Sequence, residues 1–337
     1  MQNSKNISHL YSTDNLPIIK KIIIFYIFLR EYLIKSLSLL KTILIIASVL
    51  QNVFKNFSKK GPKMQIRKIT TGLAALALMG SLQLASAAVD LTKETKAYRQ
   101  FVIEQIDFLL ADTEKFVKAL KSGDVKEAKA IYPLARMYYE RSEPIAESFG
   151  DLDPRIDARL ADLEEEGLGE KDWSGFHKIE KILWENNTTK GTEATADQLL
   201  LDIKELRAKI PTAKVDAELM LTGAVDLLNE VSTSKITGEE DIFSKTDLYD
   251  FQANIEGAEK IYQLFKPYLV KKDKKLSDEI ETQFKAVNSL LAKHNLSKNG
   301  GYDFVGYDKL TQADIKALAE AVNKLGEPLS KMGVILE

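Results

Sequence analysis

The sequence predicts an all-α protein built from two antiparallel helical bundles packed side by side. Apolar residues recur at three- and four-residue steps along most of the chain beyond residue 90. We find no useful length of the strict alternation that marks a strand, and no glycine-rich phosphate loop after a strand. Helices of about 15 to 28 residues with short loops favour antiparallel packing. Their number suggests two bundles, with a boundary near residues 205–240.

The first two predicted helices meet at a tight turn. Apolar residues at helical spacing fill residues 98–120, and Ser122-Gly123-Asp124 then stops the helix and starts the next one. The second helix is expected to run from about Asp124 to Gly150, because glycine is the common residue just past a helix end.

The later helices carry similar start and stop signals. Asp153-Pro154 is an N-cap followed by a proline in the first turn, and Gly167 closes that third helix. A glycine- and aromatic-rich loop is expected at 298–307. The remaining helices are expected at about 173–186, 193–209, 211–235, 246–265, 274–294 and 311–325.

The N-terminal residues read like a leader that follows an unrelated extension. Arg67 and Lys68 after Met64, an apolar run at 73–84 and Ala85-Ser86-Ala87 form a secretory signal peptide, predicted at 64–87. Residues 1–63 are interpreted as a spurious extension from a misassigned start codon, with no fold of their own. A membrane anchor is the alternative, but its apolar stretches fall short of the roughly 20 residues that a spanning helix needs. The predicted mature protein is a helical domain of residues 88–337.

Removing the leader makes the protein acidic. Residues 1–87 hold 12 of the 47 basic and 2 of the 49 acidic residues, so 35 basic and 47 acidic residues remain, a net charge near −12. Such a chain is a poor partner for nucleic acid or anionic lipid and a fair one for cations, although solubility alone also explains acidity. With zero cysteines it has neither disulfides nor a lipid-attachment cysteine. We expect a periplasmic monomer without stable membrane insertion.

One histidine motif is a candidate metal site. In a helix, His177 and Glu180 lie three residues apart on one face, so imidazole and carboxylate can converge on one cation. The alternative is a buried or capping histidine with an ordinary salt-bridging glutamate. His294, at a helix end, is interpreted as a surface or capping residue. Trp173 and Trp184 are expected to be core anchors.

Carboxylates elsewhere supply further candidate ligands. Glu140, Glu143 and Glu147 share one helical face after Tyr138-Tyr139, and Pro144 is expected to bend that helix and aim them into a cavity. A solvated acidic face is the simpler alternative for the glutamates. A phenol of Tyr138 or Tyr139 near the carboxylates is a candidate ligand for ferric iron, but packing is the simpler role for both tyrosines. Asp157 and the run Glu239-Glu240-Asp241 are also candidates. An oxygen-rich set with one nitrogen suits iron or a similar cation better than copper(I) or structural zinc.

Seven sequence blocks run in order across the predicted mature chain. They are YPLAR (132–136), ERSEPIAE (140–147), DLDPRID (151–157), WSGFHKIEK (173–181), KITGEE (235–240), TDL (246–248) and EPLSK (327–331). Through these blocks the chain resembles the imelysin-like family, specifically its EfeO-type branch of periplasmic iron-uptake proteins. The chain looks like the stand-alone form, without the cupredoxin domain that many members carry. Lys245 stands where members often have a histidine.

The resemblance implies a metal-binding cleft at the bundles and a role in high-affinity iron uptake. It places the metal ligands at Glu140, Glu143, Asp157, His177, Glu180 and Glu240, with Glu240 favoured over Glu239. Iron, ferrous or ferric, is the expected cation, and copper, zinc and manganese are alternatives. The implied partners are an inner-membrane iron permease and a periplasmic peroxidase.

Two other functions remain open at this point. A stand-alone relative that binds an acidic, alginate-like polysaccharide suggests a polymer-binding protein. The peptidase label attached to some relatives suggests a metallopeptidase. Hydrolytic zinc sites usually combine two histidines with a carboxylate, and the motif at 177–181 lacks the second histidine. We therefore expect a non-enzymatic protein.

Overall fold

Ten α-helices make up most of the structure, a computed structural model that describes residues 89–336. They are α3 (Thr92–Ser122), α4 (Val125–Glu140), α5 (Leu152–Asp157), α6 (Leu160–Glu165), α7 (Gly175–Glu185), α8 (Glu193–Lys209), α9 (Ala217–Thr233), α10 (Asp247–Lys272), α11 (Lys274–Leu291) and α12 (Gln312–Leu336). Within that range the only strand-like feature is a bridge between Asn295 and Phe304 in the expected loop. The all-α prediction is confirmed.

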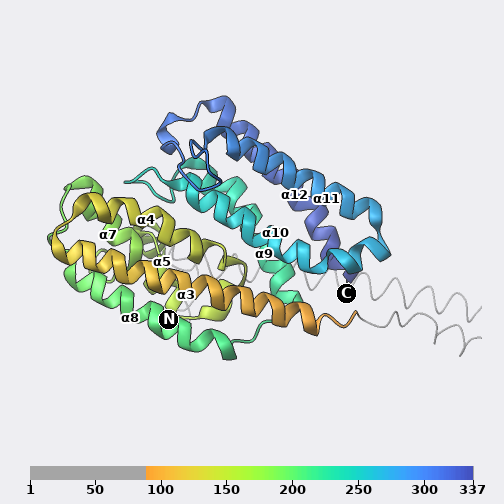
Figure 1. Ribbon diagram of the computed structural model, residues 1–337, viewed down its shortest axis with the longest axis horizontal. Coiled ribbons are helices and arrows are strands. Elements are labelled where there is room, and N and C mark those ends of the chain that lie inside the picture. Colours follow the sequence, from red (N-terminus) through yellow and green to blue (C-terminus); the bar gives the residue numbers. More distant parts are fainter. Residues whose placement is uncertain (1–88, 337) are drawn as a thin grey trace, which may run out of the picture. The chain divides into compact units, whose positions relative to one another are not determined.

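The long helices pack in two groups (Figure 1). Helices α3, α4, α7 and α8 contact one another, and so do α9, α10, α11 and α12. Helix α10 also packs against α4, and α9 packs against the 3₁₀ segment η3 (Glu143–Phe149), so a continuous apolar core joins the groups. The candidate site lies where these groups meet.

The turn between α3 and α4 forms as the sequence predicts. Gly123 has a φ of 81°, in the left-handed region that glycine adopts without strain, and its N–H bonds back to the end of α3. The side chain of Asp124 accepts a hydrogen bond from the N–H of Glu127 at 2.9 Å, which caps the start of α4.

The second predicted helix is shorter than expected. Helix α4 ends at Glu140, and Pro144 lies in the first turn of η3, so it does not bend a continuous α-helix. Pro144 has no N–H to donate to the carbonyl of Glu140, so α4 does not continue into the segment that holds Glu143. Glu140 and Glu143 are therefore held by different elements. Proline does not always end a helix here, because Pro133, Pro267 and Pro328 lie inside α4, α10 and α12.

The third predicted helix is two short ones. Helix α5 stops at Asp157, and Ala158 and Arg159 are extended before α6 begins. The break turns the carbonyl of Ala158 toward Trp173, whose Nε1 donates a hydrogen bond to it at 2.6 Å. Trp173 is buried, as predicted, and it fixes the end of α5 beside the start of α7.

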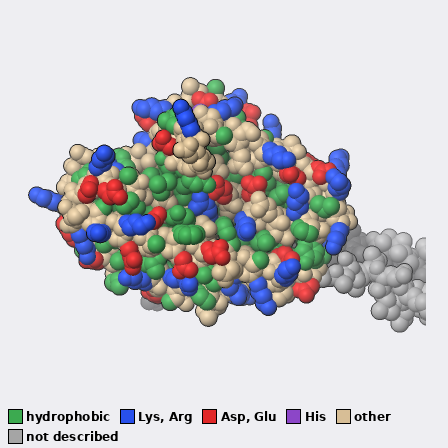
Figure 2. Space-filling model, in the orientation of Figure 1, with side chains coloured by type: hydrophobic (Ala, Val, Ile, Leu, Met, Phe, Trp, Pro, Cys, Tyr) green, Lys and Arg blue, Asp and Glu red, His purple; other side chains and the backbone are tan. Residues whose placement is uncertain are grey.

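The predictions for residues 1–63 and 64–87 lie outside the described residues. Between residues 89 and 336, none of the helices combines the length and the apolar character that crossing a membrane requires. Figure 2 shows basic and acidic side chains interspersed over one face, with apolar side chains gathered near its middle.

Candidate metal centre

Gly175 brings His177 close to helix α5. Its φ is 85°, and a Cβ at this position would lie 2.6 Å from the carbonyl carbon of Ile156. Any other residue would push α7 away from α5 or strain the backbone. This close approach sets His177, in the first turn of α7, against Asp157 at the end of α5.

The two ring nitrogens of His177 face different groups. The side chain is 2 % exposed, and Nδ1 lies 3.2 Å from Oε2 of Glu180. The buried Nε2 has no hydrogen-bond partner among the described residues. It lies 3.8 Å from Oδ1 of Asp157 and 3.8 Å from Oε1 of Glu240. One imidazole nitrogen therefore faces two carboxylate oxygens without being bonded to either.

Glu180 fixes the orientation of that imidazole. Its Oε1 accepts hydrogen bonds from the N–H groups of Phe243 at 3.0 Å and Ser244 at 2.7 Å, which ties α7 to the loop that carries Glu240. An ionised carboxylate can only accept, so Nδ1 of His177 carries the hydrogen that Oε2 receives. The lone pair of the neutral ring then lies on Nε2, the nitrogen that faces Asp157 and Glu240.

Asp241 closes the other side of the histidine. Its Oδ1 lies 3.7 Å from Nδ1 of His177 and accepts a hydrogen bond from the hydroxyl of Tyr132 at 3.0 Å. Its Oδ2 accepts from the hydroxyl of Thr246 at 2.5 Å. The donor atoms of His177, Glu180 and Asp241 thus form a second close group, but protein hydrogen bonds already engage both carboxylates.

Arg136 lies at the centre of the carboxylates. Its side chain is fully buried, and its Nη2 donates to Oε1 of Glu140 at 2.5 Å and to Oδ2 of Asp250 at 3.0 Å. Its Nη1 pairs with Oδ1 of Asp157, and its Nη2 lies 3.5 Å from Oε1 of Glu240. These two oxygens also face Nε2 of His177. Arg136 therefore neutralises part of the cluster from within.

Lys235 is a second internal cation. Its buried Nζ lies 3.3 Å from Oε2 of Glu140, 2.9 Å from Oε1 of Glu143 and 3.5 Å from Oε1 of Glu240. Asn254 donates to the same two glutamates, at 2.9 Å to Oε2 of Glu140 and at 2.5 Å to Oε2 of Glu143. Amine and amide groups thus hold Glu140 and Glu143, away from the imidazole.

Burial perturbs the protonation of the cluster. Burial raises the pKa of Asp157 to about 7, although the charge of Arg136 opposes this. Burial and Arg136 lower the pKa of His177, but the hydrogen bond to Glu180 and the charges of Asp157 and Glu180 outweigh them, so the net pKa is raised. Burial also raises the pKa of Glu143 well above its usual value, against the pull of Lys235. Asp157, His177 and Glu143 therefore bind protons more tightly than the same groups do in water, whereas Lys235 and Arg136 lower the pKa of Glu140 despite its burial.

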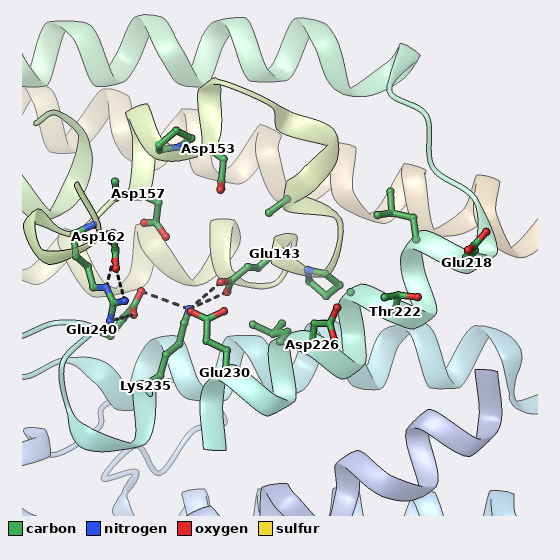
Figure 3. Close-up of a pocket in the computed structure, with 18 of the residues that line it drawn as sticks. Glu143, Asp153, Asp157, Asp162, Glu218, Thr222, Asp226, Glu230, Lys235 and Glu240 are labelled. Atoms are coloured by element: carbon green, nitrogen blue, oxygen red, sulfur yellow. Dashed lines mark hydrogen bonds and ion pairs between the residues drawn. The ribbon is translucent and has the colours of Figure 1, made fainter. Parts of the chain in front are cut away.

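An open cleft leads to these groups (Figure 3). Its volume is about 740 Å³, and its lining includes Asp157 and Glu240. Nine acidic residues line it, against Arg159, Lys214 and Lys235. Figure 3 shows Asp153 and Asp157 pointing into the space from one wall, with Lys235 between Glu143 and Glu240 at its floor. A cation in solvent would thus reach the oxygens beside His177 through an acidic passage.

The group formed by Asp157, His177 and Glu240 fits a metal ion. Its ligand atoms lie within 4.8 Å of one another. Two atoms that each lie about 2.1 Å from a metal are at most about 4.2 Å apart, so the 3.8 Å distances allow one ion to touch the nitrogen and either oxygen. That Nε2 has no hydrogen-bond partner within residues 89–336 supports the fit, because a buried polar atom without a partner is costly and rare.

The six residues expected as ligands thus fall into three settings. Asp157, His177 and Glu240 come together, Glu180 supports the far side of the ring, and Glu140 and Glu143 pair with Arg136, Lys235 and Asn254. Glu240 points into the cluster, whereas the neighbouring Glu239 is exposed and pairs with Arg159 at 3.2 Å.

Sequence reasoning did not single out the internal partners. Arg136, Lys235 and Asp250 were not named as site residues, and Asp241 appeared only within an acidic run. One local signal was present, because Arg136 and Glu140 stand four residues apart on a helix, a spacing that favours an ion pair.

The other aromatic and histidine predictions have mixed outcomes. Tyr139 is buried and its hydroxyl donates to Oδ1 of Asp153 at 2.5 Å, whereas Tyr138 packs against Phe108. Trp184 is only partly buried, edge-on to the ring of Tyr132. His294 lies in a 3₁₀ turn after α11 with its Nε2 3.9 Å from Asp314, away from the cluster contacts.

Fold and site together define an all-α protein with a buried histidine–carboxylate cluster at the floor of an acidic cleft. The chain belongs to the imelysin family, whose model, described as Peptidase_M75: Imelysin, matches residues 94–332.

Sequence relatives agree with this assignment, and one solved structure shares the fold. Efem/EfeO family lipoproteins from Staphylococcus aureus strains MSSA476 and NCTC 8325 are each 60% identical over 249 residues, which cover 74% of this chain and 86% of theirs. The fold is similar to that of a putative iron-regulated protein A precursor from Parabacteroides distasonis, with a TM-score of 0.55 and 15% identity over 75% of this chain and 97% of that one.

Proposed function

We propose that the protein is a cation-binding component of iron uptake, which holds iron through Nε2 of His177 with the carboxylates of Asp157 and Glu240. The observation that carries this is the buried Nε2, which has no hydrogen-bond partner in the described part of the chain and lies 3.8 Å from one oxygen of each carboxylate. Iron is the cargo here. The oxygen-rich donor set with one imidazole suits it, and also suits manganese or zinc.

The charge of the site supports a cation as the ligand. Seven carboxylates, those of Glu140, Glu143, Asp157, Glu180, Glu240, Asp241 and Asp250, surround Arg136, Lys235 and one imidazole. A divalent or trivalent ion would offset the charge of the ionised carboxylates and would favour ionisation of those whose pKa burial raises, such as Asp157. The Efem/EfeO family name of the relatives points the same way, toward a component associated with iron uptake.

We propose that the protein acts as a carrier and not as a peptidase. A hydrolytic site needs an activated water and usually two histidines. Among residues 89–336 the second histidine is His294, which pairs with Asp314 outside the cluster. An acidic polysaccharide is also a poor ligand, because nine acidic residues line the cleft against three basic ones.

The relatives' name also bears on location and partners. They are named lipoproteins, which supports a place in the cell envelope, outside the cytoplasmic membrane. We propose that the protein hands its ion to an inner-membrane iron permease there, together with a peroxidase of the same system. In a cell with an outer membrane, the proposed location is the periplasm.

The test is calorimetric titration of Fe²⁺ (without oxygen), Mn²⁺, Zn²⁺ and Cu²⁺ into the wild-type protein, His177→Ala and His294→Ala. We expect the wild type and His294→Ala to bind iron alike, and His177→Ala to lose most of the affinity. Equal binding by all three proteins would remove the site. Casein or peptide cleavage by the iron- or zinc-loaded protein would instead support a peptidase.

A further inference from the structure

The guanidinium of Arg136 and a cation at His177 would need the same two atoms. Nη1 of Arg136 pairs with Oδ1 of Asp157, and Nη2 approaches Oε1 of Glu240. Those are the oxygens that face Nε2 of His177. Since Arg136 is fully buried and keeps its charge, an ion that takes both oxygens must displace part of its contacts.

Asp250 offers the displaced guanidinium another position. Both Nε and Nη2 of Arg136 now donate to its Oδ2, at 3.1 Å and 3.0 Å. Its Oδ1 is buried and has no hydrogen-bond partner among the described residues. A small rotation that moves Nη2 onto Oδ1 would give a side-on, two-bond pair, which is the strongest arrangement of arginine with a carboxylate. The same rotation would take Nη2 away from Glu240.

We propose that Arg136 is an exchangeable counter-ion of the cation site. In the cation-free protein it holds Asp157 and Glu240, and in the loaded protein it pairs with both oxygens of Asp250. This inference rests on the proposed function and adds its regulation. Since the ion must displace Arg136 to bind, and Arg136 can return to help it leave, the exchange lowers the affinity to a range from which a carrier can release its cargo.

The first experiment compares two buried aspartates on the first turn of α10. Asp250→Asn removes the second acceptor that Arg136 needs. Asp247→Asn is the matched control, because among the described residues Asp247 also has a buried Oδ2 without a hydrogen-bond partner and accepts from the N–H of Asp241, but shares no hydrogen bond or ion pair with Arg136. By Mn²⁺ calorimetry we expect Asp250→Asn to weaken binding by about tenfold or more relative to Asp247→Asn. Equal losses would mean a simple charge effect and would overturn the proposal.

The second experiment observes Arg136 directly. A crystal structure of the Mn²⁺-loaded wild-type protein should show the guanidinium bonded to both oxygens of Asp250 and separated from Oε1 of Glu240. A guanidinium that keeps its present contacts in the loaded protein would overturn the exchange. This readout stands even if an Arg136 variant fails to fold.

The two proposals fail in different ways. A wild-type protein that binds no cation would overturn the proposed function, and this inference with it. If cation binding depends on His177 and Asp157, and the affinity falls equally in Asp250→Asn and Asp247→Asn, the exchange alone is overturned. Arg136→Gln, if folded, should bind Mn²⁺ more tightly by about tenfold, since the competing charge is gone; unchanged affinity would count against the exchange.

Discussion

Glu180 lies one helical turn beyond His177, with its Oε2 3.2 Å from Nδ1 of the imidazole and its Oε1 bonded to the N–H groups of Phe243 and Ser244. Both oxygens of Glu180 are therefore engaged by protein groups. The glutamate of the His-x-x-Glu motif therefore supports the ring and the loop that carries Glu240, and other carboxylates line the cleft.

Glu180→Gln should weaken cation binding by about 10- to 100-fold with little change in the free energy of unfolding. The glutamine can still accept from the backbone N–H groups, but its amide would face Nδ1 with a donor. The ring would then favour the tautomer with the hydrogen on Nε2, which blocks the lone pair. Calorimetry and imidazole ¹⁵N spectra measure the two effects. Glu185→Gln, exposed at the end of α7, is the control and should change neither.

Cation affinity should fall as the pH drops through about 7. The pKa of Asp157 is raised to about 7 and that of His177 is raised above its usual value, so protons compete for both ligand atoms over this range. Binding should be full above this range and lost below it. Mn²⁺ calorimetry between about pH 5.5 and about pH 8 measures this. Affinity that is constant across the range would contradict the assignment of these two ligands.

Gly175→Ala should destabilise the protein by about 1–3 kcal/mol or more and weaken cation binding. Alanine is strained at a φ of 85°, and its Cβ would overlap the backbone of Ile156. Relief of that overlap moves His177 away from Asp157. Chemical denaturation and Mn²⁺ calorimetry measure the two changes. Gly169→Ala is the matched control, because nothing lies within 4 Å of its added Cβ; equal effects of both variants would refute the role of the close approach.

Lys235→Met should cost about 3–5 kcal/mol of the free energy of unfolding, because it leaves the buried carboxylates of Glu140 and Glu143 without their shared cation. Methionine fills a similar volume, so the loss reports charge and not a cavity. Urea denaturation at neutral pH measures it. Lys214→Met, on the same cleft but 93 % exposed at its side chain, should have little effect. A Lys235→Met protein as stable as the wild type would show that the lysine does not hold these glutamates.

Local sequence signals predicted most of the helices and failed at the prolines. Gly123 and Asp124 mark a turn because glycine adopts the left-handed conformation that ends α3, and the aspartate side chain caps the start of α4. Prolines were less informative. Pro133 lies inside α4, whereas Pro144 lies in the first turn of η3, which packs against α9 and α10, and no short window of sequence contains those contacts.

The site shows the same division between local and distant information. The spacing of His177 and Glu180 on one helical face could be predicted, because it depends on helix geometry alone. The role of Arg136 could not, since its partners Glu240 and Asp250 are 104 and 114 residues away along the chain. The resemblance to a family supplied the carboxylates but not the cations that neutralise them.

The three residues of the proposed metal site, Asp157, His177 and Glu240, come from two parts of the chain. His177 belongs to α7 of the first group and Asp157 to α5, which packs against α7 and α8 of that group, whereas Glu240 belongs to the loop that leads into α10 of the second (Figure 1). A bound ion would therefore act as a removable cross-link between the two helix groups. A loaded protein should resist limited proteolysis of that loop better than an empty one. A receptor that draws the loop away from α5 would open the cross-link mechanically, and so could unload the ion without first reducing or chelating it.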